Sequence, residues 1–267
     1  MNIRTTSIWF VFVLFLTTSS ALAGSQSGGA PQYEIEQITA FGKQLEQELA
    51  ARGARVALVS RIGRGKGELP EGISYTHVGY AVYSQITTDD GRQLPGYVFY
   101  NLYQGVEHPD RSYLASDFPA EFFAAVYELK AGVIIPKPKL QQRLFKLFSD
   151  GSYKQLHNPD YSVLANPYNQ RFQNCTEYVL DVLHAALYQT TDMNLIKANT
   201  REWYQAQPIR IGPLKLLFAS LSMPDVRLQD QQEGGPPITS SFGSIVTYME
   251  QHQLSEESFE IQGGSPL

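Results

Sequence analysis

A single cysteine, Cys175, occurs among the 267 residues of the chain. One thiol cannot form an intramolecular disulfide, and it cannot supply the several thiolates of a structural zinc site. The five histidines are scattered and show no H-x-x-x-H spacing. We therefore expect no metal and no other cofactor.

Positive charge is also scarce. The chain has 21 Lys and Arg against 26 Asp and Glu, a net charge of −5, and it has no basic patch. Nucleic acids and anionic membrane surfaces attract proteins through positive charge, so neither is expected as a partner.

No apolar run is long enough to cross a bilayer, which takes about 20 helical residues. The longest, Ile8–Leu16, has nine residues, follows the positively charged Arg4 and precedes the A-x-A sequence Ala21–Ala23. This order predicts a signal peptide over residues 1–23, cleaved near Ala23 and Gly24, and a periplasmic or secreted protein with no transmembrane anchor after cleavage. An uncleaved membrane anchor is the alternative.

The rest of the chain suits one large domain. Removing 23 of the 267 residues leaves 244, and 43% hydrophobic residues are ample for a core. Residues 24–32 are rich in Gly and Ser and are interpreted as a flexible leader. Residues 33–267 are interpreted as a single domain with a C-terminal extension.

Hydrophobic periodicity places helices and strands in a mixed order. Because no repeating βαβ alternation occurs, we expect an α+β fold with an antiparallel sheet. A helix is also expected from Ser116 or Asp117 to Gly132, with Pro119 in its first turn, and the last residues are expected to fray. The other predicted helices span residues 38–50, 138–149, 175–188 and 242–253, and the predicted strands span residues 55–60, 74–84 and 97–103.

Cys175 can be an inert buried thiol, half of an intermolecular disulfide, or a reactive thiol. Its neighbours favour the reactive thiol: Asn174 is a good N-cap, and Glu177 three residues later completes the pattern of a capping box. Cys175 then lies in the first helical turn, where free N–H groups and the helix dipole stabilise a thiolate. The same N–H groups can hold the oxyanion that forms when a carbonyl is attacked.

A nucleophilic thiol needs a base, and His77 is the main candidate. It lies in the middle of an apolar strand, with Gly79 and Ala81 on its own face, and these small residues leave room for a helix end to approach. A satisfied core histidine is the alternative interpretation. His157, in a loop before the cysteine, is a second candidate base, whereas His184 lies about 13.5 Å further along the cysteine's own helix and cannot reach the thiol.

Several segments carry a resemblance to known proteins. The pieces SRIGRGKG, SYTHVGYAV, AGVIIPKPKLQQRL and Tyr161 to Cys175 resemble the DUF2145 proteins of bacteria. The order of His-Val-Gly on a strand, a polar residue on the next strand and Gln-Asn-Cys at a helix start resembles the circularly permuted papain-like fold. That group is related to the NlpC/P60 hydrolases and includes the lecithin:retinol acyltransferase-like proteins.

The resemblance implies roles for individual residues. It makes Cys175 the nucleophile, His77 the base and Asn101 the polar residue that orients the imidazole. Gln173 and Asn174 are expected to support the oxyanion. For Gln173, the alternative is a loop residue with a purely structural role. For Asn101, the alternative is an edge-strand residue that faces water.

The implied activity is that of an exported cysteine hydrolase or acyl-transfer enzyme. Its substrate would be an amide or ester of a cell-wall peptide or of a lipid-linked acyl group. The alternative from a different class is an inactive papain-like module that binds a partner in the cell envelope.

Overall fold

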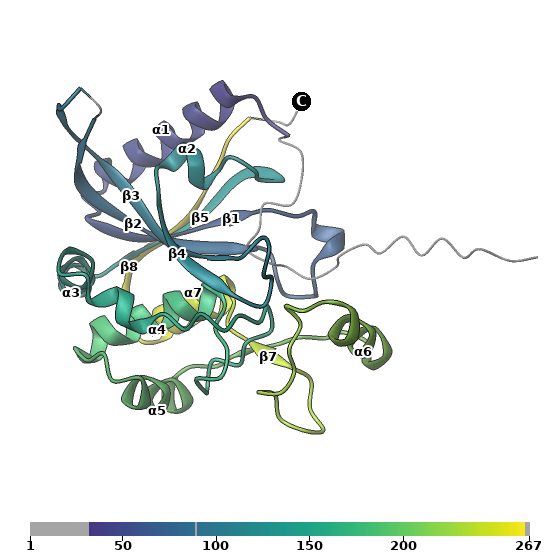
Figure 1. The fold of residues 1–267 in the computed structure, drawn as a ribbon. Coiled ribbons are helices and arrows are strands. Elements are labelled where there is room, and N and C mark those ends of the chain that lie inside the picture. Colours follow the sequence, from purple (N-terminus) through teal and green to yellow (C-terminus); the bar gives the residue numbers. More distant parts are fainter. Residues whose placement is uncertain (1–31, 89, 265–267) are drawn as a thin grey trace, which may run out of the picture.

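The computed structural model describes residues 32–88 and 90–264 (Figure 1). The predicted signal peptide and nearly all of the predicted leader lie outside the described residues. Within the described ranges, no helix is both long and apolar enough to span a membrane.

A six-stranded sheet forms the centre of the fold, in the order β4-β3-β2-β1-β5-β8. Every pair of neighbouring strands is antiparallel, as expected for the predicted α+β class. The strands are β1 (Val56–Ile62), β2 (His77–Thr87), β3 (Gln93–Gln104), β4 (Ser112–Asp117), β5 (Glu128–Pro136) and β8 (Ser255–Gln262).

Helices cover both faces of the sheet (Figure 1). On one face lie α1 (Ile35–Ala51) and the single turn α2 (Pro119–Phe122). On the other face lie α3 (Pro138–Ser149), α4 (Cys175–Tyr188) and α7 (Phe242–Gln251). The remaining elements lie outside these layers: α5 (Met193–Trp203), α6 (Pro213–Ser222), the short strands β6 (Gln207–Pro208) and β7 (Ile238–Thr239), and the 3-10 turns η1 (Lys66–Glu68) and η2 (Ser152–Leu156).

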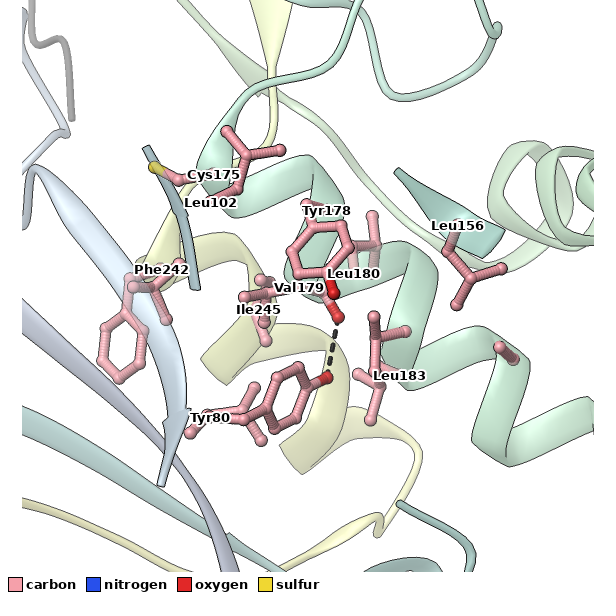
Figure 2. Close-up of a cluster of buried hydrophobic side chains, with 14 of the residues drawn as sticks. Tyr80, Leu102, Leu156, Cys175, Tyr178, Val179, Leu180, Leu183, Phe242 and Ile245 are labelled. Atoms are coloured by element: carbon pink, nitrogen blue, oxygen red, sulfur yellow. Dashed lines mark hydrogen bonds between the residues drawn. The ribbon is translucent and has the colours of Figure 1, made fainter. Parts of the chain in front are cut away.

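Alternation along β2 divides the core into two clusters. Val78, Tyr80 and Val82 face α4, whereas Ala81 faces the cluster under α1 and α2. The hydroxyl of Tyr80 donates to the carbonyl oxygen of Val179 at 2.7 Å, which fixes α4 against the sheet (Figure 2).

Most of the predicted elements are confirmed near their predicted bounds, namely α1, α3, α4, α7 and β1 to β3. The predicted helix from residue 116 to Gly132 is wrong. Only the turn α2 forms there, and Glu128–Pro136 is the strand β5, because its Val-Ile-Ile run is β-branched and is buried on both faces of the sheet.

The expectation that the last residues fray is wrong as far as residue 262, and residues 265–267 lie outside the described residues. Ser255–Gln262 forms β8, which pairs with β5 from Lys130↔Gln262 to Pro136↔Ser255. This strand is polar on its exposed side and carries little apolar periodicity, so the sequence gives only a weak signal for it.

Candidate active site

Cys175 is the first residue of α4, as predicted (Figure 2). The side chain of Asn174 caps the helix by accepting a hydrogen bond from the Glu177 N–H at 2.9 Å. The carboxylate of Glu177 does not complete the expected capping box, because it pairs with Lys197 instead. The predicted cap is therefore confirmed on the Asn174 side alone.

The Cys175 thiol lies against the strand that carries His77. Its sulfur is 4.0 Å from the carbonyl oxygen of Thr76 and 3.7 Å from Oγ1 of Thr176. The backbone N–H of Val78 also interacts with the sulfur. The thiol thus contacts the backbone on both sides of His77.

Burial dominates the electrostatics of the thiol. Only 4% of Cys175 is exposed, and desolvation raises the pKa of its thiol above the ordinary value. Hydrogen bonds from Thr176 and Val78 and the positive charge of Arg61 lower the pKa, but by less. Burial therefore opposes the thiolate that the helix start was expected to stabilise, and it leaves little of Cys175 exposed for an intermolecular disulfide.

His77 and Asn101 meet as predicted. Nε2 of His77 lies 2.8 Å from Oδ1 of Asn101. Asn101 is 1% exposed, so it does not face water as the alternative interpretation required. The ring of His77 stacks on Tyr103, with centroids 4.8 Å apart and planes 9° from parallel.

The partners of Asn101 decide which nitrogen of His77 carries the proton. Nδ2 of Asn101 donates to the carbonyl of Phe99 and to Oδ2 of Asp117, both at 3.2 Å. This orients Oδ1 toward the imidazole, so Nε2–H donates and Nδ1 keeps its lone pair. Nδ1 is buried and has no hydrogen-bond partner among the described residues. The site therefore presents an unused proton acceptor in a fixed tautomer.

Arg61 completes this environment and was not predicted from the sequence. It lies opposite His77 in the β1–β2 register and is 3% exposed, with Nη1 donating to the carbonyl of Phe122 at 2.6 Å. Burial lowers the pKa of His77 well below its ordinary value of 6.5, and the charge of Arg61 lowers it further. The sequence does contain a signal for Arg61, because an arginine among the apolar residues of a strand must find a partner or have a function.

The structure does not join the thiol and the imidazole by a hydrogen bond, because Nδ1 of His77 has no partner. The predicted room beside His77 is also filled differently from expectation. A Cβ added at Gly79 would meet Asn101 Cβ at 2.9 Å and the side chain of Phe122 at 3.4 Å, so β3 and α2 occupy this space. Helix α4 packs on the opposite face of β2, and its first residue contacts the backbone of Thr76 and Val78 on either side of His77.

The side-chain amides of Gln173 and Asn174 are not available as the predicted oxyanion donors. Both amide hydrogens of Gln173 are donated elsewhere, to the carbonyl of Leu156 at 3.0 Å and to Asp181 at 2.8 Å. The Asn174 amide donates to the carbonyl of Val163 and to Thr239. Both residues therefore hold the loop before α4 in place, and the backbone N–H groups at the start of α4 are the donors left for an oxyanion.

The other candidate histidines lie away from the thiol. His157 binds Ser112 through Nε2 at 3.0 Å and lines a different hollow. His184 is enclosed between Thr200 at 2.9 Å and Tyr248 at 3.0 Å, in a structural role.

A buried charged cluster behind the site was not predicted. Nζ of Lys197 on α5 lies 2.7 Å from both Glu177 and Asp181, which are four residues apart on α4. All three side chains are at most 2% exposed. Since Asp181 also binds Gln173, the cluster links α5 to the loop that delivers Cys175.

A small hollow of about 40 Å³ that opens to solvent adjoins Cys175 and is named here the Cys175 cleft. Within the described part of the chain, no group of three or more His, Cys, Asp or Glu could hold a metal ion. The site thus combines the buried thiol of Cys175 at the start of α4 with His77 on the adjacent strand β2. Asn101 orients the imidazole of His77, and its Nδ1 keeps a free lone pair.

The chain belongs to the DUF2145 family, described as uncharacterised proteins conserved in bacteria, whose model matches residues 48–249. This range contains Cys175, His77, Asn101 and Arg61. No curated protein and no solved structure matches the chain.

Proposed function

We propose that this chain is an exported cysteine-dependent enzyme, built on a permuted papain-like fold, that cleaves or transfers an acyl group at an amide or ester bond. The observation that carries the proposal is the free, buried Nδ1 of His77 in a tautomer fixed by Asn101, on the strand segment that the Cys175 thiol contacts. An unsatisfied buried nitrogen is costly, and such cost is commonly accepted at functional sites.

In the proposed reaction Nδ1 of His77 takes the thiol proton as the sulfur attacks the substrate carbonyl. Because burial keeps both groups neutral at rest, proton transfer accompanies attack. The new oxyanion accepts hydrogen bonds from backbone N–H groups at the start of α4. The imidazolium then returns its proton to the leaving group, and a thioester remains on Cys175.

Water or another acceptor resolves the thioester. The acceptor attacks the thioester carbonyl while His77 removes its proton. The imidazolium then gives this proton to the departing Cys175 thiolate. Asn101 accepts from Nε2–H in every step and so holds the ring in one orientation. Arg61, close to both groups, disfavours a long-lived imidazolium and favours the developing negative charge.

The test is acylation of the full chain by 4-nitrophenyl hexanoate, followed by intact-mass analysis. We expect one hexanoyl group per chain, absent in Cys175→Ala and formed about 10²- to 10⁴-fold more slowly in His77→Ala. His157→Ala is the matched control and should react like the parent. Acylation that is unaffected by His77→Ala, or that occurs only in urea, would refute the proposal.

A second candidate is an inactive module that binds a partner in the cell envelope. It is favoured by the burial of Cys175 and by the raised pKa of its thiol. It predicts that Cys175→Ala keeps every cellular effect of the parent chain. The enzyme hypothesis predicts that this variant loses the effect at normal protein levels.

A further inference from the structure

The walls of the Cys175 cleft carry no charged side chain. Four segments and the start of α4 form them, and their polar groups are hydroxyls and one amide in addition to the thiol. The lining residues are Pro70, Ile73, Tyr75, Thr76, Tyr161, Val163, Leu164, Asn174, Cys175, Thr176, Ile209, Thr239, Ser240 and Ser241.

A second hollow, of about 380 Å³, shares Tyr75 and Ser241 with the Cys175 cleft. Its lining includes two carboxylates, Glu250 and Glu260. Glu260 accepts from the hydroxyl of Tyr75 and pairs with Lys130 at 2.8 Å. Continuing from the cleft, a bound molecule would therefore meet negative charge.

The nearest cation to the sulfur does not compensate. Arg61 is absent from the walls of the cleft. Its guanidinium lies over the rings of Phe122 and Tyr103, beside His77. An anionic group in the cleft would thus lose its water without gaining a cation, and burying an unpaired charge is strongly unfavourable.

We infer that the Cys175 cleft takes an uncharged, largely apolar acyl group, and that it rejects acyl groups bearing a carboxylate. This inference rests on the proposed function, since it names the substrate class of the same thiol. Of the two substrate types expected from the sequence, it favours a neutral acyl chain over an acidic peptide.

Three 4-nitrophenyl esters of matched length test the inference on the full chain: hexanoate, adipate with one free carboxylate, and a hexanoate that ends in trimethylammonium. The rate of thioester formation on Cys175 is divided by the rate of each ester with a small free thiol, which removes differences in intrinsic reactivity. We expect the adipate ester to react at least about tenfold more slowly than the hexanoate ester, and the cationic ester to lie between them.

A variant pair separates charge from shape. Ile73 lines the cleft and is only partly buried, so a polar substitution there is tolerated better than at the fully buried wall. Ile73→Lys should raise the adipate rate relative to hexanoate by about tenfold, whereas the matched neutral Ile73→Met should leave the ratio unchanged. Circular dichroism and the thermal midpoint confirm that both variants fold.

The outcomes are distinguishable. Equal or faster acylation by adipate, or fastest acylation by the cationic ester, overturns the inference and leaves the proposed function standing. Absence of acylation by all three esters overturns the proposed function and the inference with it. A ratio of adipate to hexanoate rates that Ile73→Lys leaves unchanged also contradicts the inference, because the cleft would then not select by charge.

Discussion

Gly79→Ala is the substitution that most directly tests how the site is held together. Gly79 has no positive φ, so an alanine there is not strained by the backbone. The added Cβ would lie 2.9 Å from Asn101 Cβ and 3.0 Å from the carbonyl oxygen of Tyr100. Neither atom is the free end of a flexible side chain, so β2 and β3 must separate where Gly79 pairs with Asn101.

The expected cost follows from two opposing effects. Overpacking a rigid site destabilises by about 1–3 kcal/mol. Replacing Gly by Ala also restricts the unfolded chain and returns about 0.4–1 kcal/mol. We therefore expect Gly79→Ala to lower the free energy of unfolding by up to about 2.6 kcal/mol, and to move Asn101 away from its 2.8 Å bond with His77.

Two measurements check this prediction: urea unfolding, and the rate of Cys175 acylation by the neutral hexanoate ester. Gly67→Ala is the matched control, because Gly67 has open space around its Cβ position and no positive φ, and it should change stability by less than about 0.5 kcal/mol. We expect acylation at least about tenfold slower in Gly79→Ala alone. If both variants unfold and react alike, the close approach of β2 and β3 does not hold the imidazole.

Three further predictions concern the scaffold. Burial lowers the pKa of His184 to about 3, below the ordinary 6.5, so the unfolded chain binds the extra proton first and stability should fall as pH drops from about 6.5 toward 3; urea unfolding of His184→Gln should show a shallower loss, and an equal slope would contradict this. Lys197→Met leaves two buried carboxylates without their cation and should cost about 3–5 kcal/mol, against less than about 0.5 kcal/mol for the exposed Lys215→Met, measured by the same unfolding. Tyr80→Phe removes the bond to Val179 and should cost about 0.5–1.5 kcal/mol, so an unchanged thermal midpoint would show that this bond does not fasten α4.

The parts of the site that sequence could predict are those set by local rules. Asn174 before an apolar helical stripe marks the start of α4 and so the position of Cys175. Consecutive strands usually pair, which brings His77 and Asn101 onto neighbouring strands. The register was not predictable, since Asn101 pairs with Gly79 and reaches His77 diagonally.

The parts that sequence could not predict depend on distant packing. Arg61 stands out among apolar residues in the sequence, but its position beside His77 depends on how β2 and α2 pack around it. Lys197 reads as a surface residue of α5 until the two carboxylates of α4 meet it. Gln173 was expected to support the oxyanion, but its amide donates to the carbonyl of Leu156 and to Asp181 instead.

The outer strand β8 protects the edge of the central sheet. The family signature covers residues 48–249 and stops short of β8, which covers the hydrogen-bonding edge of β5. At the other end, the buried hydroxyl of Tyr33 accepts the backbone N–H of Leu129 in that same strand. A fragment trimmed to residues 48–249 would therefore expose a long apolar strand edge, the kind of edge through which chains aggregate.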